Sequence, residues 1–228
     1  MNYGFANAQM SFTVAQASQQ VRVQFIRQVY SILFGSLLVT VLAGFIAVQE
    51  SVLPIVMGLM PILWIGEVVC CIVLSFTRRT TGLNLLVFGL FAALLGAGLA
   101  PLLLQVSEKS PGLPTAAATL TLGVFGALST YALTTKKDFS FLGGMLFASL
   151  IGLCLVGILL IFLPSAFLSS LYSLVGVLLF SGYVLYDTSQ IIHRLQPGEA
   201  IIGAIELYLD FLNLFLFILQ LLSNRSDD

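Results

Sequence analysis

The chain has 228 residues, of which 59% are hydrophobic and only 8% are charged. Soluble domains carry about 25% charged residues, so this chain lacks the polar surface that a protein surrounded by water needs, and we expect an integral membrane protein. The formal net charge of -1 argues against a nucleic-acid partner, which requires a basic face.

Seven apolar runs are long enough to cross a bilayer as helices. About 20 helical residues span the roughly 30 Å of hydrocarbon, whereas the strands of a membrane barrel are shorter and alternate polar with apolar residues. We therefore predict an all-α membrane protein with seven transmembrane helices. The runs cover residues 29–48, 52–76, 83–104, 113–134, 139–163, 166–186 and 200–222.

These runs divide the chain into three parts. Residues 1–28 are predicted to form a polar cytoplasmic tail, residues 29–222 the seven-helix transmembrane domain, and residues 223–228 a short C-terminal tail. Pro61 lies inside the second run and is expected to kink that helix.

The third run contains small residues at helical spacing. Ala92, Gly96 and Ala100 follow one another at intervals of four residues, so they share one face of the helix. Such a face lets a neighbouring helix approach closely.

The Lys and Arg residues predict the orientation, because they gather in cytoplasmic segments of membrane proteins. With the N-terminus in the cytoplasm, the inner segments hold seven of them and the outer segments only Lys109 and Arg225. After seven crossings the C-terminus is then expected outside, in a cell inner or plasma membrane. The seven inner residues are Arg22, Arg27, Arg78, Arg79, Lys136, Lys137 and Arg194.

Two acids lie inside the last run, ELYLDFLNLFLFILQLL at residues 206–222. Asp210 is ten residues past Ala200, hence about 15 Å deep at 1.5 Å per residue. An ionised Asp at the bilayer centre costs about 2.5–3.5 kcal/mol on insertion scales. Glu206 is one turn earlier on the same face, so both acids demand an explanation.

Two more acids and one cation complete the candidate site. Asp187, in YVLYDTSQII, ends the sixth run on the predicted cytoplasmic side. Glu67 lies within the second run, and Arg78 follows it by eleven residues, about three turns, so both can share one face. If the helices bring these acids together, they would share protons and titrate as a coupled set. The alternative is that each acid is structural and is satisfied by Ser, Asn213 or backbone groups.

At these residues the chain resembles the Bax inhibitor-1 family, the transmembrane Bax inhibitor motif proteins, in its bacterial form. The most specific parts are YVLYDTSQII around Asp187 and ELYLDFLNLF around Asp210. GAGLAPLL at residues 96–103, LPTA at 113–116 and DFSFLGGML at 138–146 support it. The resemblance implies six helices around a central seventh and a pH-sensitive Ca²⁺ leak.

The resemblance also implies roles for individual residues. The family's di-aspartyl pair matches Asp187 and Asp210, and the helix-two Glu and Arg of bacterial members match Glu67 and Arg78. Arg78 would then hold an Asp in one gating state. Glu206 occupies a position where only some relatives carry an acid.

We therefore expect a calcium-leak channel gated by the Asp187–Asp210 pair, with Arg78 as the competing counter-ion and Glu67 and Glu206 along the ion pathway. Calcium would be the permeating ion, bound transiently at Asp187 and Asp210, and no cofactor is expected. One alternative is an interaction protein that modulates a membrane-bound protease through its N-terminal tail. Another is a proton-coupled transporter.

An enzyme is not expected. The sequence contains neither HExxH nor GxSxG, and its single histidine, His193, is placed in the loop after the sixth run, where a solvated side chain without a role is the simplest interpretation. The three cysteines, Cys70, Cys71 and Cys154, lie in apolar runs without CxxC spacing, so metal or disulfide roles are not indicated.

Overall fold

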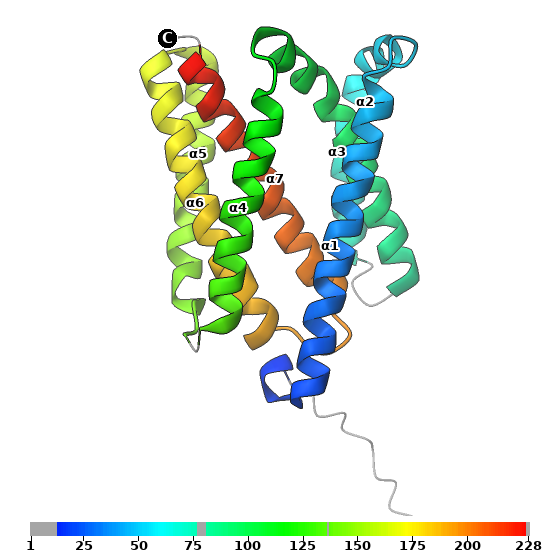
Figure 1. Ribbon diagram of the computed structural model, residues 1–228, viewed down its shortest axis with the longest axis vertical. Coiled ribbons are helices and arrows are strands. Elements are labelled where there is room, and N and C mark those ends of the chain that lie inside the picture. The colour runs from blue at the N-terminus through cyan, green and yellow to red at the C-terminus, as the bar shows by residue number, and fades with distance from the viewer. Residues whose placement is uncertain (1–12, 77–80, 136, 227–228) are drawn as a thin grey trace, which may run out of the picture.

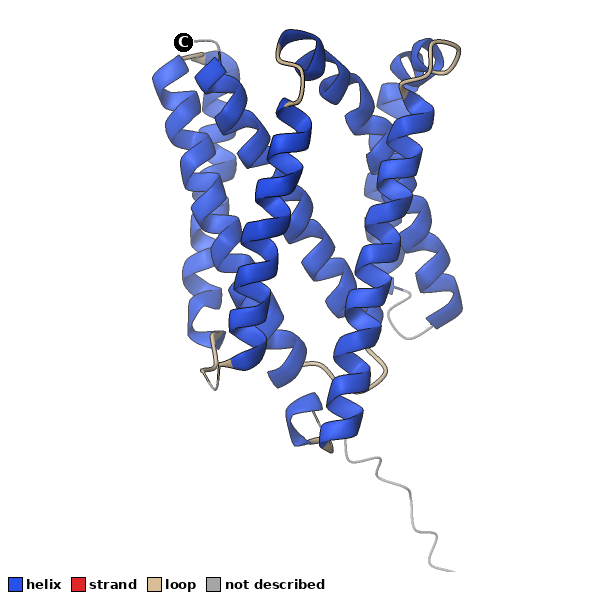
Figure 2. Ribbon diagram, viewed as in Figure 1, coloured by secondary structure: helices blue, strands red, loops and turns tan. Residues whose placement is uncertain are grey.

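The computed structural model describes residues 13–76, 81–135 and 137–226, and in these ranges the regular structure is helical (Figures 1 and 2). The seven long helices have 20 to 29 residues, and about 20 suffice to cross the hydrocarbon of a bilayer. They are α1 (Gln19–Ala47), α2 (Leu53–Phe76), α3 (Thr81–Lys109), α4 (Leu113–Thr134), α5 (Gly143–Phe162), α6 (Ala166–His193) and α7 (Ala200–Ser226). Two short 3₁₀ turns are η1 (Val14–Gln16) and η2 (Ser140–Leu142).

All seven predicted spans are confirmed as helices, but four of the helices extend well beyond the apolar runs. Helix α1 begins ten residues earlier than predicted, because Ser18 caps it by accepting a hydrogen bond from the Val21 N–H. Helices α3, α6 and α7 continue to Lys109, His193 and Ser226. Hydropathy marks only the part of a helix that lies in lipid, whereas capping residues decide where it begins.

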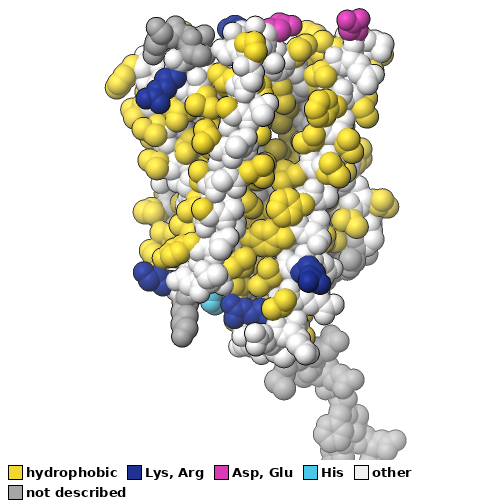
Figure 3. All heavy atoms as spheres, in the orientation of Figure 1, with side chains coloured by type: hydrophobic (Ala, Val, Ile, Leu, Met, Phe, Trp, Pro, Cys, Tyr) yellow, Lys and Arg dark blue, Asp and Glu magenta, His cyan; other side chains and the backbone are white. Residues whose placement is uncertain are grey.

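The surface has the distribution of polarity that a bilayer requires. Apolar side chains cover the sides of the bundle, and the visible Lys, Arg, Asp and Glu side chains lie at its two ends (Figure 3). Exposed hydrophobic residues occur on every helix, for example Phe45, Ile65 and Phe147. All seven helices are long and apolar enough to cross a membrane, so the chain is an integral membrane protein.

Helix α7 is the central element of the bundle. In its most apolar window 56% of the residues are buried, against 11–28% in the other spans. Helices α1, α3, α4 and α6 pack against it, while α2 packs mainly on α3 and α5 mainly on α6. The expected central seventh helix is therefore present, with four helices as its main neighbours and α2 and α5 outside them (Figure 1).

Small residues bring the backbones of α1 and α3 into direct contact. A Cβ added to Gly96 would overlap with the carbonyl group of Thr40, and one added to Gly44 would lie 3.3 Å from the Gly96 oxygen. The small-residue face of α3, with Ala92 and Ala100 fully buried, thus provides the close helix contact that its spacing predicts.

This contact predicts a selective sensitivity to added volume. Gly96→Ala should destabilise the protein by about 1–3 kcal/mol, the usual range for overpacking, because α1 and α3 must separate. Gly89→Ala, on the same helix with no atom within 4 Å of the new Cβ, is the matched control. It should be neutral or slightly stabilising, since Ala favours helix over Gly by about 1 kcal/mol. Thermal unfolding of both variants in detergent measures the difference, and equal stability would contradict this account of the contact.

Candidate functional site

The structure brings three of the predicted acids together where α6 and α7 pack side by side. Asp187 lies six residues before the end of α6, and Asp210 lies ten residues after the start of α7. Their carboxyl groups are close enough to interact with each other, and Glu206 is close enough to interact electrostatically with both. We call these three residues the acid cluster, and the end of the bundle that holds the α6–α7 connection the acid end.

The cluster is largely shielded from solvent. Asp210 is only 4% exposed. A hydrogen bond between two carboxyl groups needs a proton on one of them, because a carboxylate can only accept. One oxygen of Asp210, Oδ2, and one of Glu206, Oε2, are buried without a hydrogen-bond partner among the described residues. These oxygens can therefore accept a proton, a water molecule or a cation.

Arg194 supplies a positive charge at the edge of the acid cluster. It lies in the connection between α6 and α7, and its Nη2 is 2.5 Å from Oε1 of Glu206. Partial burial lowers the pKa of Arg194, but the Glu206 carboxylate and its hydrogen bond outweigh this and leave the pKa above the ordinary value. Arg194 also interacts with Asp187. The predicted counter-ion Arg78 lies in residues 77–80, outside the described residues.

The α6–α7 connection is also tied to the first segment of the chain. The backbone N–H of Val14, in η1, donates to the carbonyl oxygen of Leu195 at 2.9 Å. Val14 is completely buried and Leu195 nearly so. The turn η1 therefore packs against the connection that carries Arg194.

Glu67 lies apart from this cluster. Its Oε1 is 3.1 Å from the position that a Cβ on Gly98 would take, so its side chain faces α3. The described groups on which it acts electrostatically are Cys70, Cys71 and Tyr208. Tyr208 points to the α1–α3 side of α7, where its hydroxyl group is 2.6 Å from Oγ1 of Thr40. Glu67 is thus placed on the opposite side of α7 from Asp187.

Hydroxyl and amide groups from other helices add to the buried polar surface. The hydroxyl groups of Tyr30 in α1, Ser129 in α4 and Thr188 in α6 lie next to one another, but within the described part of the chain none makes a hydrogen bond of good geometry. Asn84, in α3, is 1% exposed, and neither of its amide atoms has a hydrogen-bond partner among the described residues. Thr188 follows Asp187 directly, so the hydroxyl group of Tyr30 lies beside the helix segment that bears one of the acids. Single hydroxyl residues are common in membrane helices, and the sequence carried no signal that could single these out.

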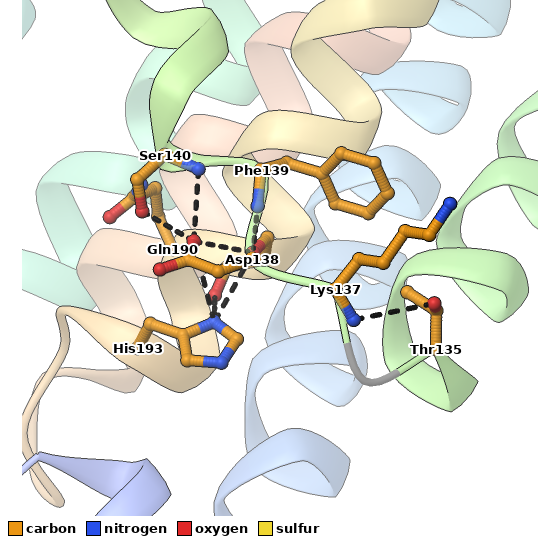
Figure 4. A network of polar contacts seen from close by, with 8 residues as sticks. Thr135, Lys137, Asp138, Phe139, Ser140, Gln190 and His193 are labelled. Atoms are coloured by element: carbon orange, nitrogen blue, oxygen red, sulfur yellow. Dashed lines mark hydrogen bonds and ion pairs between the residues drawn. The ribbon is translucent and has the colours of Figure 1, made fainter.

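A second polar network joins the α4–α5 connection to the last turn of α6 (Figure 4). The backbone N–H of Phe139 donates to Oγ of Ser189 at 3.2 Å, and Nε2 of Gln190 donates to Oγ of Ser140 at 3.1 Å. The hydroxyl and backbone N–H groups of Ser140 both donate to Asp138. Through these bonds the connection is fastened to α6 just beyond Asp187.

The placement of His193 in a solvated loop is wrong. His193 is the last residue of α6, which runs seven residues beyond the span predicted from hydropathy. Its Nδ1 is 2.9 Å from the carbonyl oxygen of Ser189, which requires a proton on Nδ1, and 3.9 Å from Oδ1 of Asp138. His193 therefore belongs to the polar network that fastens α6.

Comparison with known proteins places this arrangement in a family. The family model described as "Inhibitor of apoptosis-promoting Bax1" matches residues 22–227. The chain belongs to the Bax inhibitor-1 family. The protein lifeguard 4 of Mus musculus is 37% identical over 92% of this chain and 88% of its own length. Bax inhibitor 1 of Schizosaccharomyces pombe is 36% identical over 92% and 79%, and the Golgi anti-apoptotic protein of Vaccinia virus (strain Lister) is 36% identical over 94% and 92%.

As a candidate ion site, the acid cluster differs from a resident metal centre. In the described ranges, no group of three or more His, Cys, Asp or Glu side chains has the arrangement of a metal-binding site.

The family resemblance directed attention to Asp187 and Asp210, and the structure places these two together. The structure adds Arg194 to the site. Arg194 lies in a short connection after a helix, and nothing in the sequence indicated that it pairs with Glu206, twelve residues later.

The polar network of Figure 4 predicts a local change in backbone protection. The hydrogen bonds from Ser140 hold the pKa of Asp138 below its ordinary value. The stabilisation from Asp138 is therefore present above the unfolded-state pKa of about 3.9 and is lost as the pH falls through the lower folded-state pKa. At neutral pH, Asp138→Ala should increase hydrogen exchange of the amide groups at residues 139–143, as measured by mass spectrometry.

The exposed neighbour Lys137 provides the control for this prediction. Lys137→Gln keeps the backbone hydrogen bond from Lys137 to Thr135 and should leave exchange at residues 139–143 unchanged. Equal exchange in the wild type and Asp138→Ala would show that Asp138 does not fasten the connection.

Proposed function

We propose that this Bax inhibitor-1 family protein is a pH-sensitive calcium-leak channel gated by Asp187 and Asp210. One observation carries the proposal: two carboxyl groups on neighbouring helices of a membrane-spanning bundle lie close enough to interact with each other. Ionisable groups inside membranes are costly, and they commonly mark ion or proton pathways. No catalytic step is part of the proposal.

A shared proton provides the closed state. With one proton between them, Asp187 and Asp210 attract each other and join α6 to α7. When that proton leaves, two like charges face each other in a poorly solvated environment and repel. The helices then separate at this level, and the exposed carboxylate oxygens offer the ligands that Ca²⁺ prefers. Calcium would bind there transiently as the permeating ion.

The surrounding charges adjust this equilibrium. Arg194 neutralises Glu206 at the acid end, which keeps a third negative charge from acting on Asp187 at full strength. Glu206 would line the entrance of the pathway. We retain Arg78 as a proposed competing counter-ion and Glu67 as a proposed pathway acid. Glu67 would act on the far side of α7, beside Tyr208.

The orientation follows from the positive charges. The acid end carries Arg22, Arg27, Lys137 and Arg194 among the described residues (Figure 3 shows part of this surface). We propose that it faces the cytoplasm, with the C-terminus outside and the chain in a cell inner or plasma membrane. The acids would then respond to cytoplasmic pH.

The paired acids should behave as one unit in flux measurements. Asp187→Asn and Asp210→Asn each remove the shared proton equilibrium, so each should reduce Ca²⁺ flux into proteoliposomes and abolish its pH dependence. The double variant should be little worse than either single variant, because the effects of coupled residues are not additive. Glu108→Gln changes an exposed acid at the other end of the bundle and should leave flux and pH response intact. Normal, pH-responsive flux in both Asn variants would refute the channel site.

Arg194 should set the pH at which flux begins. Arg194→Ala releases the Glu206 carboxylate, whose negative charge then opposes ionisation of Asp187. We expect the pH of half-maximal flux to move upward by about one unit, equivalent to about 1.4 kcal/mol, with the maximal flux retained. Arg225→Ala at the opposite end is the control. An unchanged pH profile in Arg194→Ala would remove this residue from the mechanism.

A further inference from the structure

A deep apolar groove opens on the side of the bundle between α1 and α4. Its volume is about 620 Å³, and α1, α3, α4 and α7 form its walls. Thr40 and Ser107 are the polar side chains among its lining residues, and Thr40 is already bonded to Tyr208. Figure 3 shows apolar side chains in the recess between α4 and α1.

The packing of the bundle explains why the groove exists. Helix α1 is held against α3 by the backbone contact at Gly96 and also packs on α7, whereas α4 packs on α6 and α7. No strong contact joins α1 to α4, so α7 forms the floor of the space between them (Figure 1). Small residues such as Gly44 and Ala118 keep the space open.

The dimensions of the groove indicate what can occupy it. It extends along α1 from Phe34 to Val48, about 21 Å at 1.5 Å per residue. One leaflet contributes about half of the roughly 30 Å hydrocarbon core, so the groove is longer than one leaflet is thick. An extended hydrocarbon chain is the shape that fits a groove running lengthwise along a membrane-spanning helix.

The surroundings of the groove identify the source of that chain. Its rim residues Leu38, Val41 and Phe45 are 51–68% exposed and face the bilayer. A cavity with apolar walls does not retain water, and acyl chains are the apolar molecules at this depth. We propose that the groove binds one acyl chain of a phospholipid from the leaflet opposite the acid end, with its head group at the level of Ser107 and Pro114.

The bound chain would contact the central helix close to the acid cluster. Phe211, Leu212 and Phe215, which line the floor of the groove, follow Asp210 within five residues on α7. Phe211 also packs edge-to-face on Phe125 of α4, with ring centroids 5.4 Å apart. A lipid seated here supports α7 on the side that α1 and α4 leave uncovered. This binding does not depend on the proposed channel activity.

Native mass spectrometry of the full chain, extracted from phospholipid vesicles into mild detergent, tests the proposal. The wild type should retain a single phospholipid through detergent exchange. Ala118→Trp fills the groove and should lower retention by about tenfold, a loss of about 1.4 kcal/mol. Ala148→Trp places the same side chain on the exposed surface of α5 and should retain the lipid as the wild type does.

A second measurement on the wild type keeps the test independent of whether Ala118→Trp folds. A phospholipid with a diazirine near the end of one acyl chain should, after detergent exchange and illumination, label peptides of α1, α4 and α7 that line the groove. Labelling spread over α2 and α5, or equal retention in both Trp variants, would show that only the general lipid layer is bound and overturn the proposal. A dimer that Ala118→Trp dissociates would assign the groove to a second copy instead.

Discussion

The structure depends on one constraint: inside a bilayer, no water is available to satisfy a polar group, so each must find its partner within the protein. The backbone meets this constraint by forming seven helices. The carboxyl groups can meet it only near the bundle interior, and α7, the most buried helix, carries two of them. Asp210 is shielded because α1, α3, α4 and α6 surround the helix on which it lies. The acids of α7 are therefore tolerated because this helix lies at the centre of the bundle.

Hydropathy was sufficient to predict the spans, and the family resemblance suggested the pairing of Asp187 with Asp210, but neither indicated the ends of the helices or the ion pairs. Hydropathy responds to the lipid-facing part of a helix, so it missed about the last two turns of α6 and placed His193 in a loop. It also gave no sign of Arg194 pairing with Glu206, because that contact depends on how the α6–α7 connection folds back. Eleven-residue spacing suggested that Glu67 could act with Arg78. Glu67 faces α3 beside Gly98, and Arg78 lies outside the described residues, so this pairing stays a prediction.

Polarity is distributed unevenly along the bundle. The acid cluster, the hydroxyl groups around Tyr30 and the network at Asp138 lie toward the acid end, where α6 and α7 are joined. Toward the other end, α1 and α3 pack through Gly44 and Gly96, and the walls of the groove are apolar. In the proposed channel, an ion entering from the acid end would pass polar groups until it reached the acids. The apolar half of the bundle beyond them would then provide the main barrier in the proposed closed state.

The hydrogen bond from Val14 to Leu195 has a mechanical consequence. It fastens the segment ahead of α1 to the connection that carries Arg194, so these two parts of the chain, far apart in sequence, bear force together. A displacement of Val14 is passed to the α6–α7 connection through this hydrogen bond and to α6 through the packing of η1 on that helix. A molecule that pulled on the chain at this point would therefore act on the helix that carries Asp187.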